Sequence, residues 1–177
     1  MELLISMSAS SYDNLRALIV EDNAHMRVLL RSLLQALGIR NIHESNDGAS
    51  GFAELCARNP DIVLTDLSMA PTDGIHLTKQ IRSGNGCPNR YVPIIMVTGH
   101  TEKARVEAAR DAGVTEFLAK PITVQNLMAR LTEIVERPRP FVKCDTYFGP
   151  ERRRRKLESY TGPWRRNDDF KDDLEIR

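Results

Sequence analysis

A doubly wound α/β fold, in which helices cover both faces of a parallel sheet, is predicted by two features of this 177-residue sequence. Short apolar runs rich in Ile and Val alternate with longer amphipathic stretches, and five such pairs follow one another. Runs that are apolar on both faces suit buried parallel strands, whereas apolar residues at helical spacing suit helices that lie on a sheet. This alternation favours a parallel sheet with helical crossovers.

The predicted elements alternate from residue 15 to residue 136. Strands are expected at residues 15–20, 41–45, 61–65, 92–98 and 115–119, of which the second is the weakest. Helices are expected at residues 24–37, 49–58, 74–83, 102–112 and 123–136, several of them after a capping Asn, Asp or Thr. Right-handed crossovers leave few topologies for such a chain, and we expect the flavodoxin-like strand order 2-1-3-4-5.

Composition and charge predict a globular body whose cysteines are reduced, followed by a basic tail. No apolar run approaches the eighteen or so residues of a membrane span, and no secretory leader is evident, so we expect a cytoplasmic protein without membrane insertion. The spacing of Cys56, Cys87 and Cys144 argues against a disulfide framework or a zinc site. Residues 1–136 hold 13 basic and 16 acidic residues, a net charge of −3, whereas residues 137–177 hold 12 and 8, a net charge of +4.

Polar residues follow the apolar runs at the points where the predicted strands end. They are Glu21 and Asp22 after the first run, Asp66 after the third, Thr98 at the end of the fourth and Lys120 after the fifth. Because the carboxyl ends of parallel strands share one rim, these side chains are expected to lie together. Carboxylates crowded in this way repel one another, and a bound cation relieves this repulsion. Mg²⁺ prefers such oxygen ligands. With a lysine and a hydroxyl beside them, the site suits phosphoryl transfer to Asp66.

Four segments of the sequence resemble the receiver domain of two-component response regulators. They are VEDN at residues 20–23, LTDLSMAPTDG at 64–74, VTGH at 97–100 and FLAKP at 117–121, and the resemblance covers roughly residues 14–136. The resemblance implies that Asp66 is the phosphoacceptor. It also implies that Mg²⁺ is held by the carboxylates of Glu21, Asp22 and Asp66 and by the backbone carbonyl of Ser68.

The resemblance also assigns roles to the later strands. It implies that Thr98 bonds a phosphoryl oxygen, that Lys120 pairs with the phosphoryl group, and that Phe117 is the aromatic switch. The bond between Lys120 and Pro121 is expected to be cis. Ser68 and His100 occupy positions that tune autodephosphorylation in this family, so the lifetime of the phosphoryl group is left open.

Residues 137–177 are predicted to be a tail without a core of its own, and residues 1–13 a short N-terminal extension. The tail mixes Pro, Gly, aromatic and charged residues without a sustained period, so an extended arm is expected. Its sequence from Tyr147 to Arg153, YFGPERR, recurs from Tyr160 to Arg166 in the related form YTGPWRR, and residues 152–156 are five consecutive basic residues. Such a tail can fold back on the receiver or a dimer mate, dock a partner protein, bind nucleic acid or only be solvated. It is too short for a helix-turn-helix output domain, and nucleic-acid binding is not favoured.

We therefore expect a stand-alone response regulator. Its partners are expected to be a sensor histidine kinase or a histidine phosphotransfer protein, together with a downstream protein target. It is not expected to be an enzyme beyond its own phosphoryl transfer and autodephosphorylation, and it is expected to be a monomer or a phosphorylation-dependent homodimer. Two alternatives stay open: a phosphate shuttle or sink without output, and a regulator that binds nucleic acid through the arginine-rich tail.

Overall fold

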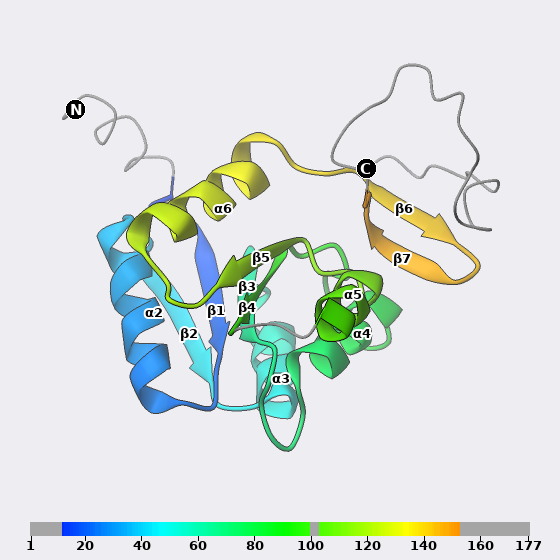
Figure 1. Cartoon of the computed structure of the whole chain (residues 1–177), viewed down its shortest axis with the longest axis horizontal. Helices are drawn as coiled ribbons and strands as arrows, with labels where there is room; N and C mark the ends of the chain where they lie inside the picture. Colours follow the sequence, from blue (N-terminus) through cyan, green and yellow to red (C-terminus); the bar gives the residue numbers. More distant parts are fainter. Residues whose placement is uncertain (1–11, 100–102, 153–177) are drawn as a thin grey trace.

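A five-stranded parallel sheet forms the centre of the computed structural model, which describes residues 12–99 and 103–152 (Figure 1). The strand order is β2-β1-β3-β4-β5, as the sequence predicts. The strands are β1 (Arg16–Val20), β2 (Asn41–Ser45), β3 (Ile62–Asp66), β4 (Ile94–Thr98) and β5 (Glu116–Ala119). The helices are α2 (Ala24–Ala36), α3 (Gly48–Arg58), α4 (Gly74–Ser83), α5 (Lys103–Asp111) and α6 (Val124–Glu136). The ends of these elements differ from the predicted ends by no more than two residues.

Side-chain capping explains where four of these helices begin. The side chains of Asn23, Asp47, Asp73 and Thr123 each accept a hydrogen bond from a backbone N–H in the first turn of α2, α3, α4 and α6. Each bond satisfies a donor that the helix itself leaves free. Gly84 ends α4 in the left-handed region, at a φ of 77°, which a glycine adopts without strain.

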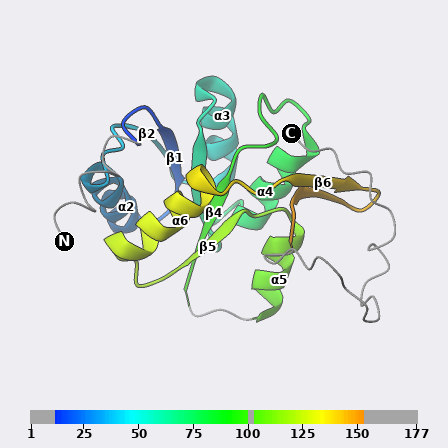
Figure 2. The same cartoon turned by 90° about the horizontal axis from the view of Figure 1, so that it is seen from above.

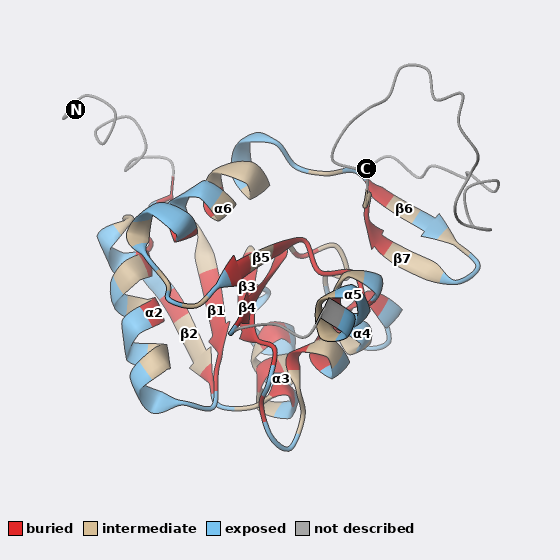
Figure 3. Ribbon diagram, viewed as in Figure 1, coloured by how far each residue is buried: buried red, intermediate tan, exposed pale blue. Residues whose placement is uncertain are grey.

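Two apolar layers hold the helices on opposite faces of the sheet (Figures 2 and 3). Successive strand residues point to opposite faces, so Ala17 and Ile19 of β1 belong to one layer while Leu18 and Val20 belong to the other. Leucines of α2 and α6 fill the first layer, and α3, α4 and α5 cover the second. Every residue of β3 and β4 is buried, as expected for strands covered on both faces.

The core begins before the predicted receiver boundary at residue 14. Tyr12 is only 2% exposed and packs in the layer that α2 and α6 cover. Its hydroxyl lies 3.2 Å from that of Thr132 on α6. The segment predicted as an N-terminal extension therefore contributes one side chain to the core.

An antiparallel hairpin follows α6, where no strand is predicted from the sequence. It consists of β6 (Phe141–Cys144) and β7 (Tyr147–Pro150). Phe141 and Phe148 pack against Tyr91, with ring centroids 5.1 and 5.2 Å from that of Tyr91. Four-residue strands carry too short a pattern to predict from sequence, and these are held by aromatic contacts with a residue about fifty positions earlier.

The hairpin covers a buried arginine at the end of α4. Arg82 is 3% exposed, and its guanidinium donates to the carbonyl oxygens of Gly113 (3.0 Å), Arg90 (2.7 Å) and Val92 (2.9 Å). The ring of Phe141 lies over the guanidinium, 5.0 Å away. Burial lowers the pKa of Arg82 to about 9. A cation buried in this way depends on its acceptors and on the covering ring, which ties the hairpin to the body.

The remaining sequence predictions divide between confirmed and undescribed parts. Lys120–Pro121 is cis, as expected, and Ala70–Pro71 is also cis. The three cysteines are free. Within residues 12–99 and 103–152, no helix is both long enough and apolar enough to cross a membrane. His100, the basic residues after Arg152 and the second copy of the repeat lie outside the described residues.

Candidate functional site

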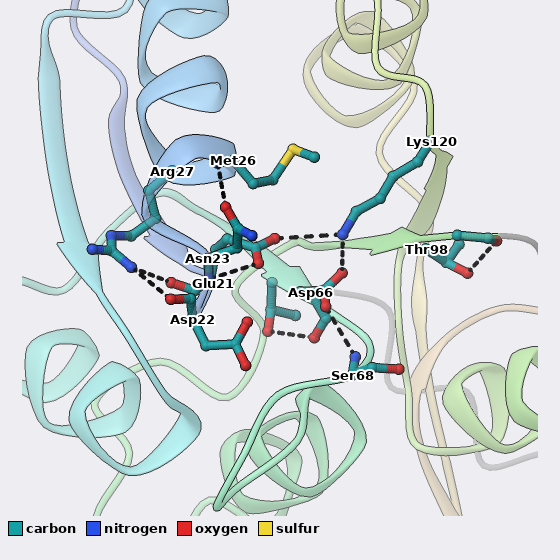
Figure 4. A network of polar contacts seen from close by, with 11 residues as sticks. Glu21, Asp22, Asn23, Met26, Arg27, Asp66, Ser68, Thr98 and Lys120 are labelled. Carbon is teal, nitrogen blue, oxygen red and sulfur yellow. Dashed lines mark hydrogen bonds and ion pairs between the residues drawn. The ribbon is translucent and has the colours of Figure 1, made fainter.

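The polar residues selected from the sequence converge at the carboxyl ends of the strands (Figure 4). In the parallel register, Val20 at the end of β1 pairs with Thr65 on β3. The pair Glu21–Asp22 therefore follows β1 beside Asp66, which ends β3. Lys120 follows β5, and its N–H donates to the carbonyl of Thr98 at 2.8 Å, which joins the last two strands at the same rim. The strand order therefore brings these side chains together at one rim of the sheet, as the sequence predicts.

Three carboxylates form an acidic cluster at this rim. One carboxylate oxygen from each of Glu21, Asp22 and Asp66 lies within 4.8 Å of the others. Glu21 and Asp66 are buried, at 1% and 6% exposed, whereas Asp22 is exposed. Burial and the repulsion of Asp66 raise the pKa of Glu21, although the N–H of Asn23 and the charge of Lys120 oppose this. The cluster therefore carries an excess of negative charge that a cation would relieve.

Lys120 is the basic group of the site. Its Nζ lies 2.8 Å from Oδ1 of Asp66 and 3.7 Å from Oε2 of Glu21. Burial alone would lower the pKa of Lys120, but the hydrogen bond and attraction of Asp66, together with the charge of Glu21, outweigh it and raise the pKa. The lysine therefore stays protonated, and its ammonium group balances only part of the negative charge of the three carboxylates.

The structure places the other predicted residues around this centre at different distances. The N–H of Ser68 donates to Oδ2 of Asp66 at 3.2 Å, so the loop after β3 folds back on the carboxylate. The hydroxyl of Thr98 donates to the carbonyl of Gly99 at 3.1 Å, and no hydrogen bond between this hydroxyl and Asp66 is found among the described residues. Phe117 lies one position along β5 from the buried Glu116 and packs, partly buried, in the layer beneath α4 and α5.

Three further residues support the site, and no role there was predicted for them from the sequence. Asn23 caps α2 with its side chain, and its N–H donates to Oε1 of Glu21 at 3.1 Å. Arg27, one turn along α2, donates to the carbonyl oxygens of Glu21 (2.7 Å) and Asp22 (3.3 Å). Arg105 reaches the loop after β3 from α5. An Asn four residues before an Arg was the available signal for the first two, because Asn favours the N-cap and the Arg then lies one turn into the helix, close to the residues that precede it.

The rim presents oxygen donors and one ammonium group, which are the groups that handle a hydrated divalent cation and a small tetrahedral anion. Asp66 is the one carboxylate of the three that contacts the lysine at hydrogen-bond distance.

Comparison with known proteins identifies the family. The response regulator receiver domain matches residues 17–132. Chemotaxis protein CheY-3 of Vibrio cholerae is 34% identical over 131 residues, which cover 74% of this chain and 99% of that protein. Chemotaxis protein CheY of Pseudomonas aeruginosa is 32% identical over 123 residues, which cover 70% of this chain and 98% of that protein.

A solved structure agrees with these relatives. It is the receiver domain of the sensor histidine kinase PA1611 from Pseudomonas aeruginosa, with a magnesium ion coordinated in its active site cleft. Its TM-score with this chain is 0.62 at 29% identity, and the match covers 69% of this chain and 98% of that one. These relatives support a role in phosphorylation-dependent signalling. The chain therefore belongs to the response regulator receiver domain family, whose members are signalling proteins rather than classical enzymes.

Proposed function

We propose that this chain is a response regulator that accepts a phosphoryl group on Asp66 from a histidine kinase or a histidine phosphotransfer protein. The observation that supports this most directly is the position of the Asp66 carboxylate, which lies 2.8 Å from the Lys120 ammonium group and beside two further carboxylates. Catalysis of phosphoryl transfer to a carboxylate comes mainly from positioning the reacting groups and from neutralising their negative charge. The site offers both.

Mg²⁺ is the proposed cofactor, and the residues present fit it. Oε2 of Glu21 is buried and accepts no hydrogen bond from the described residues, although Lys120 lies 3.7 Å away. A buried carboxylate oxygen left in this state suits a hard cation. Glu21, Asp22, Asp66 and the backbone carbonyl of Ser68 would hold the ion. When bound, Mg²⁺ supplies positive charge that neutralises the charge on the phosphoryl oxygens.

In the proposed transfer, groups of this chain accept the phosphoryl group from the donor and hold it. A carboxylate oxygen of Asp66 attacks phosphorus, the phosphorus–nitrogen bond of the donor phosphohistidine breaks, and the imidazole leaves with the electrons of that bond. Lys120 is placed to hold a phosphoryl oxygen, because its ammonium group already contacts the accepting carboxylate. Slow attack of water on the acyl phosphate would return Asp66 to its free form, as autodephosphorylation.

A change at the surface is the proposed output. The Thr98 hydroxyl, which now bonds the carbonyl of Gly99, would turn to a phosphoryl oxygen, and the partly buried ring of Phe117 would follow. The affected surface would consist of α5, β5 and α6, and its partner would be a protein. Arg139, which leads into the hairpin, forms an ion pair with the buried Glu116 of β5, so the tail is attached to this surface.

The proposed organisation keeps the sequence boundaries. Residues 14–136 form the receiver unit, residues 1–13 an N-terminal extension and residues 137–177 a basic tail, in a cytoplasmic regulator. Burial of Tyr12 and packing of the hairpin on the body support a receiver unit that both flanking segments help to stabilise.

Labelling with a small phosphodonor tests the acceptor. With acetyl phosphate and Mg²⁺, the intact mass of the wild-type chain should rise by one phosphoryl group, and Asp66→Asn should take none. Asp61→Asn is the matched control, because Asp61 precedes the same strand and pairs with Arg16 at the opposite end, 2.9 Å away. Persistent labelling of Asp66→Asn, or equal loss in both variants, would contradict the assignment.

A further inference from the structure

Arg105 joins α5 to the loop that follows the proposed phosphoacceptor. Its Nη1 donates to Oγ of Ser68 at 2.8 Å, and its Nη2 donates to the carbonyl of Leu67 at 3.4 Å. Nη2 also lies 3.7 Å from Oδ2 of Asp73, the residue that caps α4. The guanidinium therefore spans the first two residues after Asp66, and it comes from an element that is distant from Asp66 in the sequence.

The contacts of Arg105 form a short path to the accepting carboxylate. Arg105 holds the side chain of Ser68, and the N–H of Ser68 holds Oδ2 of Asp66 at 3.2 Å. A movement of either end of this path changes the geometry at the other end. The path is independent of Lys120, which contacts the other oxygen of Asp66.

The charges at this place favour movement once Asp66 is modified. A phosphoryl group adds about 1.5 to 2 negative charges and three strong acceptor oxygens. An arginine is the side chain best suited to bond such a group through two donors. The present contact between Arg105 and Asp73 is weak by comparison. It is long, and both side chains are more than a third exposed, so it does little to hold the guanidinium in place.

We propose that Arg105 is the residue through which phosphorylation of Asp66 draws α5 toward the loop at residues 67–73. In the unmodified chain the guanidinium rests on Leu67, Ser68 and Asp73. In the phosphorylated chain it gives up the contact with Asp73, bonds a phosphoryl oxygen and pulls the first turn of α5 with it. This inference rests on the proposed function. It adds Arg105 as the residue that links the site at Asp66 to the proposed output surface on α5.

Hydrogen exchange measured by mass spectrometry, with and without acetyl phosphate and Mg²⁺, tests the link. In the wild-type chain, labelling should slow exchange of the α5 backbone amides roughly fivefold, as expected for one half-exposed charge-assisted bond. In Arg105→Gln, the fraction of chains that intact mass shows to be labelled should lose that slowing. Arg105→Lys should keep part of it, because lysine retains the charge without the two-pronged donor.

Arg110→Gln is the matched control on the same helix. Arg110 pairs with Asp111, 3.2 Å away, and makes no contact with the loop among the described residues. This variant should show the full wild-type slowing. A role for Arg105 that is only structural would speed exchange of α5 equally in labelled and unlabelled chains and leave their difference unchanged, which would overturn the proposal.

Intact mass separates this failure from failure of the proposed function. If the wild-type chain takes no phosphoryl group, the assignment of Asp66 is wrong and the link falls with it. If the wild-type chain is labelled and α5 shows no slowing, only the role of Arg105 is refuted.

Discussion

Gly74 controls how closely α4 approaches the strand that carries Asp66. A Cβ built on Gly74 would lie 2.2 Å from the backbone carbonyl oxygen of Asp66 and 3.0 Å from the sulfur of Met96. Real Cβ atoms essentially never lie closer than 3.0 Å to another atom, so Gly74→Ala must separate the helix from the strand by nearly 1 Å. The obstacle is backbone, which cannot turn aside as a side-chain end could.

The expected cost of Gly74→Ala combines three effects. Overpacking costs about 1–3 kcal/mol, and the weak bond from the N–H of Gly74 to the carbonyl of Leu67, 3.4 Å long, loses up to about 1 kcal/mol. The lower chain entropy of alanine in the unfolded state returns about 0.4–1 kcal/mol. We expect a net loss of about 2 kcal/mol in the free energy of unfolding, and hence a fall of about 1 M in the urea midpoint at a slope near 2 kcal/mol/M.

Urea unfolding with Gly99→Ala as the control tests this reasoning. Among the described residues, no atom outside Gly99 and its two chain neighbours lies within 4 Å of a Cβ built on Gly99, so this variant should stay within about 0.5 kcal/mol of the wild type. Displacement of Asp66 should also slow labelling of Gly74→Ala by roughly 10- to 100-fold. If Gly74→Ala were as stable as Gly99→Ala, the contact between α4 and Asp66 would not be as tight as the structure has it.

Two further predictions concern the metal and the hairpin. Mg²⁺ at ten times its dissociation constant should stabilise the wild-type chain by about 1.4 kcal/mol, measured as a shift in the thermal midpoint. Glu21→Gln should lose most of that shift, whereas Glu54→Gln, which removes a surface carboxylate on α3 paired with Arg58, should keep it; equal shifts in both variants would argue against Glu21 as a ligand. Phe141→Ala should cost about 3 kcal/mol and speed hydrogen exchange across β6 and β7, because the ring packs on Tyr91 and covers a buried arginine; unchanged exchange would show that the hairpin stands without it.

Periodicity determined most of the fold at the level of sequence. Strands and helices of the body were predictable because each is buried on a face that its own spacing of apolar residues defines. Caps such as Asp47 and Asp73 act within three residues and are therefore also visible in the sequence. The candidate site followed from the same reasoning, since parallel strands place their carboxyl ends on one rim.

Contacts between distant residues were decided only by the tertiary structure. The hairpin at residues 141–150 forms because Phe141 and Phe148 find Tyr91 and two arginines, Arg82 and Arg90, on the body. Nothing local to those short strands predicts such partners.

The sequence by itself determined which residues stand at the ends of the strands, and so determined the acidic cluster and Lys120. It did not determine that Arg105 would reach Ser68 or that Arg82 would be buried against three backbone carbonyls. Which residue ends a strand is a local property of the sequence. Because the strands are parallel, the sheet then brings all of these residues to one edge. The reach of an arginine depends on the distance between two packed elements, which only the folded chain defines.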